Sequence, residues 1–302
     1  MGKTLRIYLA DDKPTGILIA EIINWTGQIL VGPRSQLDDL AKRKEVARTG
    51  IYCLVGLDPE NPLRDRVYIG EGDNVLDRLK QHDKSDDKAF WTRTVVVVSK
   101  DENLTKSHVR HLENQLVQFT TEAKRASLAN RNTPQPKLLP EPETADMDFF
   151  LEQIKMVLPV LGFSFLIPKP SVPQTVEPSS PRFVMERVGI KAIAVEIEGE
   201  FIVLKGSTVR EKGAASWRGY IELRNQLLKD KKIIDDPNSD NLIFDEDTSF
   251  SSPSAAGCVI CASDVNGRMH WLVEGTTKSY GQWKEEKVEL ASDHHPEHDK
   301  GK

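Results

Sequence analysis

Hydrophobic and polar residues alternate near the start of the chain, a pattern typical of β-strands with one buried face. Leu5, Ile7 and Leu9 alternate with polar positions, and β-branched residues are frequent in the stretches 16–25 and 29–31. Together these stretches predict a small β meander.

A charged segment, 35–47, follows the meander and predicts a short helix. We expect the meander and this helix to form a β-rich N-terminal subdomain, residues 1–47. The densest basic cluster of the chain spans the end of this segment and consists of Lys42, Arg43, Lys44 and Arg48. Such a cluster can contact a DNA backbone or can be an exposed helix face, and the pattern favours neither.

The next segment changes to an α/β pattern that begins with a hairpin. Two stretches alternate hydrophobic residues around a tyrosine, Tyr52 in the first and Tyr68 in the second. The segment 58–62 between them, Asp-Pro-Glu-Asn-Pro, has strong turn chemistry. Alternation of side chains along paired strands then places both tyrosines on the same face of the sheet.

A helix that Asn74 can cap is expected after the hairpin. Arg78 and His82 lie four residues apart in it and therefore share a helix face. A buried strand is expected at 94–99. A second helix should begin near Thr105, because its apolar residues follow a helical spacing: Val109, Leu112, Leu116 and Phe119.

Glu113 lies at the edge of this apolar stripe. A carboxylate in that position is expected to pair with a cation or to bind a metal ion, since an unpartnered buried charge is costly. The histidines of the same helix, His108 and His111, are a poor metal pair by comparison and are expected at the surface.

Prolines divide the second half of the chain. We expect a proline-rich linker at 139–182 that contains one amphipathic helix, at about 146–158, and a disordered tail at 289–302. Between them, residues 183–288 predict a separate α+β domain, with strands at 191–197 and 200–205, a helix at 216–229 and another helix starting near Ser251.

Length and composition support more than one domain, and the charge is distributed unevenly between them. The chain has 302 residues, 38% of them hydrophobic, which is enough for two or more ordinary cores. Residues 1–140 carry 22 Lys and Arg against 19 Asp and Glu, or +3. The totals of 41 and 46 leave 19 against 27, or −8, for the remainder. The N-terminal half is therefore the better candidate for a nucleic-acid partner.

Several classes of protein are disfavoured. The N-terminus lacks the apolar run of a secretory signal, and no apolar stretch has the length of a membrane span, so a cytoplasmic location is expected. Three cysteines do not make a disulfide framework. The Cys258 and Cys261 pair has metal-binding spacing without a second ligand pair, and core packing is the favoured interpretation.

The residues from 48 to about 135 resemble the GIY-YIG nuclease superfamily. The resemblance rests on an ordered set: Gly50-Ile51-Tyr52, Tyr68-Ile69-Gly70, Arg78 with His82, the helical Glu113, and the terminal Asn130 or Asn132. It implies a nuclease domain at 48–138. The fold class is then α/β (α+β), with a small antiparallel core and flanking helices, preceded by the meander and followed by the separate domain.

By this similarity the chain would be an endonuclease that hydrolyses DNA phosphodiester bonds with one divalent cation, Mg²⁺ or Mn²⁺. Glu113 would hold the cation, and Arg78 would clamp the phosphate with its planar fork. Tyr52 and Tyr68 would orient the attacking water, and one of them would accept its proton. His82 would relay the proton or contact a phosphate. Asn130, which the Leu-Ala-Asn spacing favours over Asn132, would cap the site by hydrogen bonding.

One position departs from the family pattern. The excision-repair branch carries a lysine soon after its second triplet, where this chain has Glu71-Gly72-Asp73. Lysine-assisted activation of Tyr68 is then not expected, and Tyr52 is at least as good a candidate for the base. An inactive DNA-binding or assembly module, or an RNA-directed nuclease, also remains open.

A second resemblance covers roughly residues 200–275. Phe250 to Ala256, Asn266-Gly267 and Trp271 look like a small domain of unknown function that occurs at the C-terminus of some such nucleases and of restriction-modification proteins. This domain could bind DNA or a protein partner, and its acidic balance favours a protein.

Overall fold

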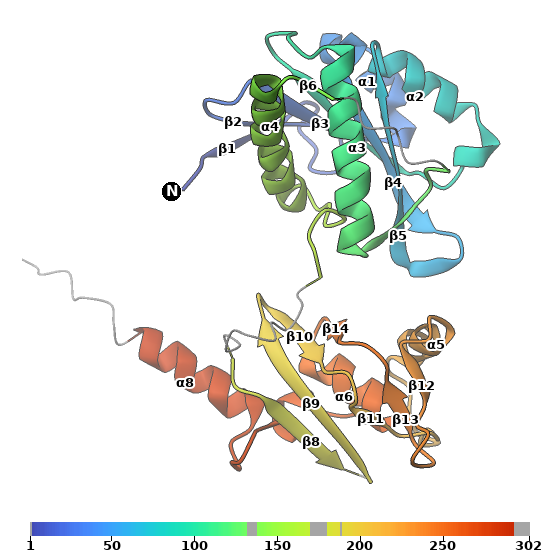
Figure 1. Ribbon diagram of the computed structural model, residues 1–302, viewed down its shortest axis with the longest axis vertical. Coiled ribbons are helices and arrows are strands. Elements are labelled where there is room, and N and C mark those ends of the chain that lie inside the picture. Colours follow the sequence, from blue (N-terminus) through green and yellow to red (C-terminus); the bar gives the residue numbers. More distant parts are fainter. Residues whose placement is uncertain (1, 132–137, 170–179, 188, 293–302) are drawn as a thin grey trace, which may run out of the picture. The chain divides into compact units, whose positions relative to one another are not determined.

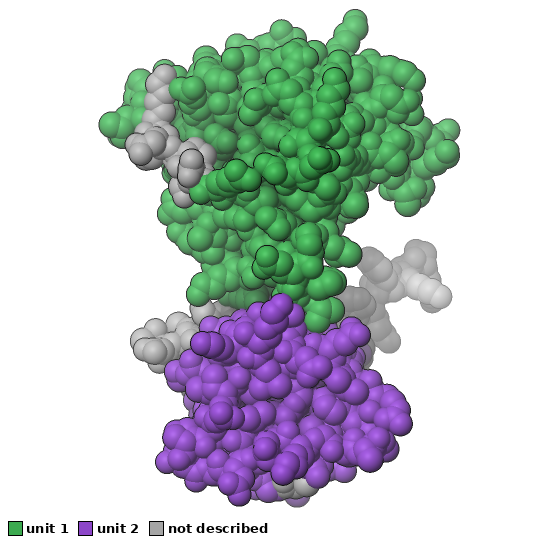
Figure 2. Space-filling view, turned by 90° about the vertical axis from the view of Figure 1, so that its right-hand side faces the viewer, with its two compact units in different colours: residues 1–169 green, residues 170–302 purple. Residues whose placement is uncertain are grey.

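The chain divides into two compact units, Met1–Lys169 and Pro170–Lys302 (Figure 2). The computed structural model describes residues 2–131, 138–169, 180–187 and 189–292. Each unit has hydrophobic clusters of its own, so each is described by itself. The mixed helices and strands confirm the predicted α+β class and the separate C-terminal domain (Figure 1).

A single seven-stranded sheet forms the centre of unit 1. Its order is β1-β2-β3-β6-β4-β5-β7, and the pairing of β5 with β7 is parallel whereas the other pairs are antiparallel. The strands are β1 (Leu5–Leu9), β2 (Leu18–Ile22), β3 (Gly27–Pro33), β4 (Gly50–Asp58), β5 (Asn61–Gly72), β6 (Arg93–Ser99) and β7 (Ala126–Leu128).

The N-terminal meander belongs to this sheet, so the predicted boundary at residue 47 was wrong. Strand β3 pairs along its whole length with β6, from Gly27 opposite Ser99 to Pro33 opposite Arg93. The valines of β6 therefore lie between the meander and the hairpin of β4 and β5. Sequence periodicity identified the meander strands but could not show which strand edge they would pair with.

Helices cover both faces of the sheet. The helices α3 (Lys106–Ala123) and α4 (Glu141–Val160) pack on one face, and α1 (Leu37–Leu40) and α2 (Val75–Asp83) pack on the other. Three short 3-10 helices complete unit 1: η1 (Arg34–Gln36), η2 (Lys44–Ala47) and η3 (Asp86–Lys88).

The single helix predicted over 35–47 is instead broken into η1, α1 and η2. Leu40 and Val46 are both fully buried, although they lie six residues apart. On one continuous helix they would point about 120° apart. The break between α1 and η2 allows both side chains to reach the same core.

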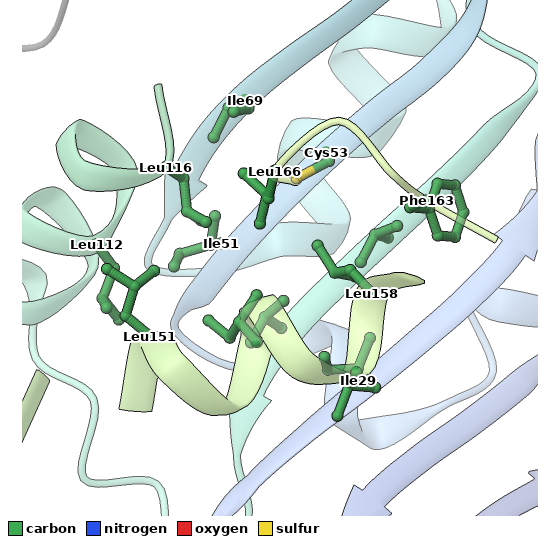
Figure 3. Close-up of a cluster of buried hydrophobic side chains, with 14 of the residues drawn as sticks. Ile29, Ile51, Cys53, Ile69, Leu112, Leu116, Leu151, Leu158, Phe163 and Leu166 are labelled. Carbon is green, nitrogen blue, oxygen red and sulfur yellow. The ribbon is translucent and has the colours of Figure 1, made fainter. Parts of the chain in front are cut away.

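The predicted linker, 139–182, is for the most part an element of unit 1. Helix α4 buries Leu151 and Leu158 against the sheet, and Phe163 and Leu166 after it enter the same core (Figure 3). The helix is longer than the predicted 146–158, because Pro140 precedes it and the proline at its second position is compatible with a first turn.

Unit 2 contains a five-stranded sheet of order β14-β10-β9-β8-β15 and a three-stranded sheet of order β11-β13-β12. Its strands are β8 (Phe183–Arg187), β9 (Ile190–Ile197), β10 (Glu200–Val203), β11 (Thr208–Val209), β12 (Ile233–Asp235), β13 (Leu242–Phe244), β14 (Thr248–Phe250) and β15 (Leu272–Val273). Its helices are α5 (Ile221–Lys229), α6 (Pro253–Cys261), α7 (Gly267–His270) and α8 (Tyr280–Ser292).

The helix predicted at 216–229 starts later, at Ile221, after Tyr220 in the left-handed region with φ 63°. Cys258 and Cys261 are buried core residues of α6, as the favoured interpretation held. The predicted tail boundary at residue 289 falls inside α8, and residues 293–302 lie outside the described part of the chain. In the part that the structure describes, no helix has the length and apolar character needed to span a membrane.

Candidate functional site

Tyr52, Tyr68 and His82 meet on the face of the sheet covered by α2. In the hairpin, Tyr52 lies opposite Gly70 and Tyr68 lies opposite Leu54, which places both tyrosines on one face as predicted. Their ring centroids are 6.1 Å apart. The Tyr52 hydroxyl is 2.8 Å from His82 Nε2, and the His82 ring lies against Tyr68 with centroids 5.0 Å apart.

Glycines at the ends of the triplets make room for this cluster. A Cβ atom at Gly70 would lie 2.4 Å from the Tyr52 hydroxyl oxygen, so any side chain there would displace the phenol. A Cβ atom at Gly50 would lie 2.4 Å from the carbonyl oxygen of Val97. Neither glycine has a positive φ, so backbone conformation does not require glycine at these positions. Close packing does.

Arg78 reaches the cluster from α2. The helix begins after Asn74, whose side chain accepts a hydrogen bond from the Asp77 amide as predicted. Arg78 crosses Gly72, where a Cβ atom would lie 2.8 Å from its Cγ, and its Nη1 donates to Gln81 Oε1 at 2.9 Å. Its Nε is buried and has no hydrogen-bond partner among the described residues. A half-buried guanidinium with an unused donor is suited to bind an anion.

The protonation of the cluster follows from its burial. Tyr52 is completely buried, which raises the pKa of its phenol, as does the neighbouring Tyr68, and Arg78 opposes the increase. Burial, together with the charges of Arg78 and Lys88, lowers the pKa of His82 to about 4. His82 is therefore neutral near pH 7, and one of its ring nitrogens can accept a hydrogen bond from the Tyr52 hydroxyl.

Glu113 is half-buried on α3, at the edge of the helix stripe as predicted. Burial and the neighbouring Glu71 raise its pKa to about 7, although Lys106, Arg110 and Arg78 act in the opposite direction. Glu71 itself is paired with two of these cations, with Lys106 Nζ at 2.6 Å and Arg110 Nε at 3.6 Å. Glu113 is thus the carboxylate of this region that lacks sufficient compensating charge.

A divalent cation fits this carboxylate. Within the described residues, no three His, Cys, Asp or Glu side chains gather into a metal-binding group. Mg²⁺, however, commonly uses one or two carboxylates and completes its shell with water and phosphate oxygens. Glu113 could hold it in this way, and the charge of the cation would favour the ionised carboxylate.

Asn130 positions the hairpin. Its Oδ1 accepts from the Ile69 amide at 3.0 Å, and its Nδ2 donates to the Ile69 carbonyl at 2.7 Å. Both bonds hold the strand segment between Tyr68 and Gly70. Asn132, the other candidate, lies outside the described residues.

Lys88 is a site residue that sequence reasoning missed. It lies on η3, twenty residues after Tyr68, and its Nζ is 3.5 Å from the centroid of the Tyr68 ring. A cation over an aromatic face is attracted by the ring quadrupole. Lys88 thus places a lysine beside Tyr68, although the sequence directly after the second triplet contains none. No motif spacing identifies it, because the turn 84–89 alone brings it back to the sheet.

The four basic residues predicted to contact DNA line one surface hollow of about 470 Å³. Gln28, Glu45 and Lys100 complete its lining. Lys42 is paired with Asp39 at 2.6 Å and Arg48 with Glu102 at 3.1 Å. The hollow adjoins the site through the backbone, because the Val75 amide at the start of α2 donates to the Arg48 carbonyl.

The two histidines of α3 are not surface residues, contrary to expectation. His108 Nε2 is 3.1 Å from Glu143 Oε2, and His111 lies near Asp148 with a side chain that is 12% exposed. Both face α4. Their contacts with Glu143 and Asp148 link α3 to α4.

The comparisons with known proteins concern unit 2. No curated protein and no solved structure matches the chain. A family model matches residues 183–284 and does not extend to the tyrosine cluster of unit 1. The match is wider than the resemblance over 200–275, and it covers β8 to the first part of α8. Residues 183–284 thus form a domain similar to the family described as a domain of unknown function, DUF4357.

Proposed function

We propose that unit 1 is an endonuclease of the GIY-YIG type that hydrolyses DNA phosphodiester bonds with the help of one divalent cation. The observation that carries the proposal is the gathering of Tyr52, Tyr68 and His82 beside Arg78, whose buried Nε has no partner in the described chain. Apolar packing of tyrosines does not require a guanidinium beside them, whereas binding of a phosphate does benefit from one.

Arg78 binds the scissile phosphate, because its fork donates two parallel hydrogen bonds and stays charged at every relevant pH. The water oxygen attacks phosphorus while the bond to the 3′ oxygen breaks, and the leaving 3′ oxygen keeps the electron pair of that bond and takes a proton from solvent. The proton of the water passes to the Tyr52 oxygen as Tyr52 passes its own proton to His82 Nε2. This relay avoids a free phenolate, which the raised pKa of Tyr52 disfavours. The negative charge that develops on the phosphate stabilises the protonated His82 and so offsets the lowered pKa of its imidazole.

The remaining residues assist this reaction. A cation at Glu113 would stabilise the charge that develops on the phosphate oxygens. Tyr68, with Lys88 over its ring, orients the water. The basic hollow formed by Lys42, Arg43, Lys44 and Arg48 contacts the DNA backbone away from the reacting phosphate. A cytoplasmic location and a protein partner for the acidic unit 2 stay predictions.

The test is cleavage of plasmid, branched and damaged DNA by the full chain in Mg²⁺ or Mn²⁺. Glu113→Gln and Arg78→Ala should each lower the rate roughly 10²- to 10³-fold. Glu122→Gln, an exposed glutamate on the same helix, is the matched control and should leave the rate unchanged. Cleavage that survives both site substitutions would exclude this site as its source.

The complete burial of Tyr52 favours a second candidate, an inactive module that binds DNA or assembles a larger complex. Under that alternative the chain binds DNA with an affinity that ignores Mg²⁺, and no substrate is cut. The control is Tyr220→Phe, a substitution of an exposed tyrosine in unit 2. DNA cleavage that is lost in Tyr52→Phe but kept in Tyr220→Phe would rule out the inactive module.

A further inference from the structure

Strand β1 is an edge of the seven-stranded sheet, and no strand among the described residues pairs with its outer side. It pairs with β2 on one side and is the first strand in the sheet order. Ile7, Tyr8 and Leu9 are 43%, 61% and 37% exposed, although the strand is well aligned with β2. The strand contains no proline, its register with β2 has no bulge, and Arg6 is its one charged residue, so few of the features that keep edge strands from pairing are present.

The register between β1 and β2 shows which backbone amides and carbonyls of β1 do not bond to β2. The Ala10 amide donates to the Ile17 carbonyl, and the Ile23 amide donates to the Thr4 carbonyl. In an antiparallel pair, hydrogen-bonded positions alternate, so the even-numbered residues of β1 bond to β2. The amides and carbonyls of Leu5, Ile7 and Leu9 therefore point outward from the sheet.

We propose that this edge pairs with the β1 edge of a second copy of the chain, antiparallel about a twofold axis at Ile7. The sequence Leu5-Arg6-Ile7-Tyr8-Leu9 is self-complementary in that register. Ile7 faces Ile7 of the partner subunit, and Leu5 faces Leu9 of the partner subunit. All of these are outward-bonding positions, so each facing pair exchanges two backbone hydrogen bonds.

The side chains also complement each other on both faces. Leu5, Ile7 and Leu9 lie on the face covered by α4, since they oppose Ile22, Ala20 and Leu18 of that core. On the other face, Arg6 lies opposite Tyr8 of the partner subunit, a cation and an aromatic ring at the short distance of a non-hydrogen-bonded pair.

Helix α4 extends the apolar surface beside β1. Phe149 is 56% exposed, and Lys3, just before β1, lies over its ring with Nζ 5.8 Å from the centroid. Lys3 also donates to Gln153 of the same helix. A stable dimer buries roughly 800 Å² on each subunit, more than five strand residues supply, and the exposed side of α4 with Phe149 and Met156 provides further area.

The dimer leaves the tyrosine cluster accessible. Strands β4 and β5, which carry Tyr52 and Tyr68, lie on the other side of β2, β3 and β6 from this edge. Substitutions in β1 therefore test the pairing without touching the proposed nuclease site, and the two proposals can fail separately.

Sedimentation equilibrium of the full chain tests the pairing. We expect a mass twice that of the 34.0 kDa chain. Ile7→Lys and Ile7→Glu should each give monomers, because like charges would face each other across the axis. Leu57→Lys, at an exposed position of β4, is the matched control and should stay dimeric.

Mixing the two Ile7 variants distinguishes pairing from misfolding. The two substitutions place opposite charges at facing positions, so an equimolar mixture of the Ile7→Lys and Ile7→Glu variants should recover a dimer. In the wild type, exchange of the Leu5, Ile7 and Leu9 amides should slow with rising protein concentration. A monomeric wild type, a dimer that survives Ile7→Lys, or a mixture that stays monomeric would overturn the proposal.

Discussion

At the scale of single residues, burial sets the protonation of the site. His82 and Tyr52 share a hydrogen bond at 2.8 Å, and burial favours the neutral form of both. Glu113 is neutral for the same reason over much of the acidic range, with a pKa of about 7. Below about pH 7, and in the absence of a bound cation or phosphate, the positive charge of Arg78 is therefore not balanced by Glu113.

This arrangement predicts how Glu113 affects stability. Its pKa is about 7 in the folded chain and near 4.5 when unfolded, so folding binds an extra proton between these values and stability falls as pH rises through them. Glu113→Gln mimics the protonated form. It should stabilise the metal-free protein at pH 8 by roughly 1–3 kcal/mol and have little effect at pH 4.

Urea unfolding at the two pH values measures the difference, with Glu122→Gln as the control that should show none. Mn²⁺ at pH 8 should raise the stability of the wild type but not that of Glu113→Gln, because the cation needs the ionised carboxylate. An equal gain at pH 4 and pH 8 would contradict the assigned pKa.

At the scale of elements, the hairpin of β4 and β5 positions the chemistry. Asn130 binds the backbone of Ile69 with both ends of its amide, and Gly70 lets the Tyr52 phenol pass over β5. The second triplet is thus a packing requirement as much as a chemical one. The tyrosine hydroxyl and the glycine on the opposite strand belong to one geometric unit.

Gly70→Ala tests this unit. The new Cβ would lie 2.4 Å from the Tyr52 hydroxyl oxygen, so the ring must move and its bond to His82 must break. We expect a loss of cleavage of at least about 10²-fold and a destabilisation of about 1–3 kcal/mol. Gly32→Ala, on β3 of the same sheet, meets its nearest atom at 3.7 Å and should be nearly neutral. Comparable effects of the two substitutions would remove the special role of Gly70.

At the scale of the whole molecule, the two units have separate cores. Leu116 is fully buried in unit 1, and Trp271 is fully buried in unit 2, where its indole donates to the Pro253 carbonyl. Units with independent cores are expected to unfold as separate cooperative transitions.

Scanning calorimetry of the full chain should therefore resolve two transitions. Trp271→Ala should remove about 3–5 kcal/mol from one of them, and Leu116→Ala about 2–5 kcal/mol from the other. Each substitution should leave the second transition in place. A single transition that both variants shift would show that the units unfold together.

Local patterns predicted the parts of unit 1 that depend on near neighbours. The facing tyrosines followed from a period of two and from a turn that contains two prolines, and the cap at Asn74 and the stripe containing Leu112 followed from helical spacing. These features depend on residues within a few positions of one another, and their energetics are largely local.

Tertiary structure alone decided which segments meet. The pairing of β3 with β6 merged the meander with the hairpin, α4 joined unit 1 instead of a linker, and Lys88 came to lie over Tyr68. Each depends on which buried surface or strand edge is available elsewhere in the fold. The sequence thus predicted which residues, Lys88 excepted, form the candidate site. Their protonation states, contacts and burial depend on packing between segments that are distant in the sequence.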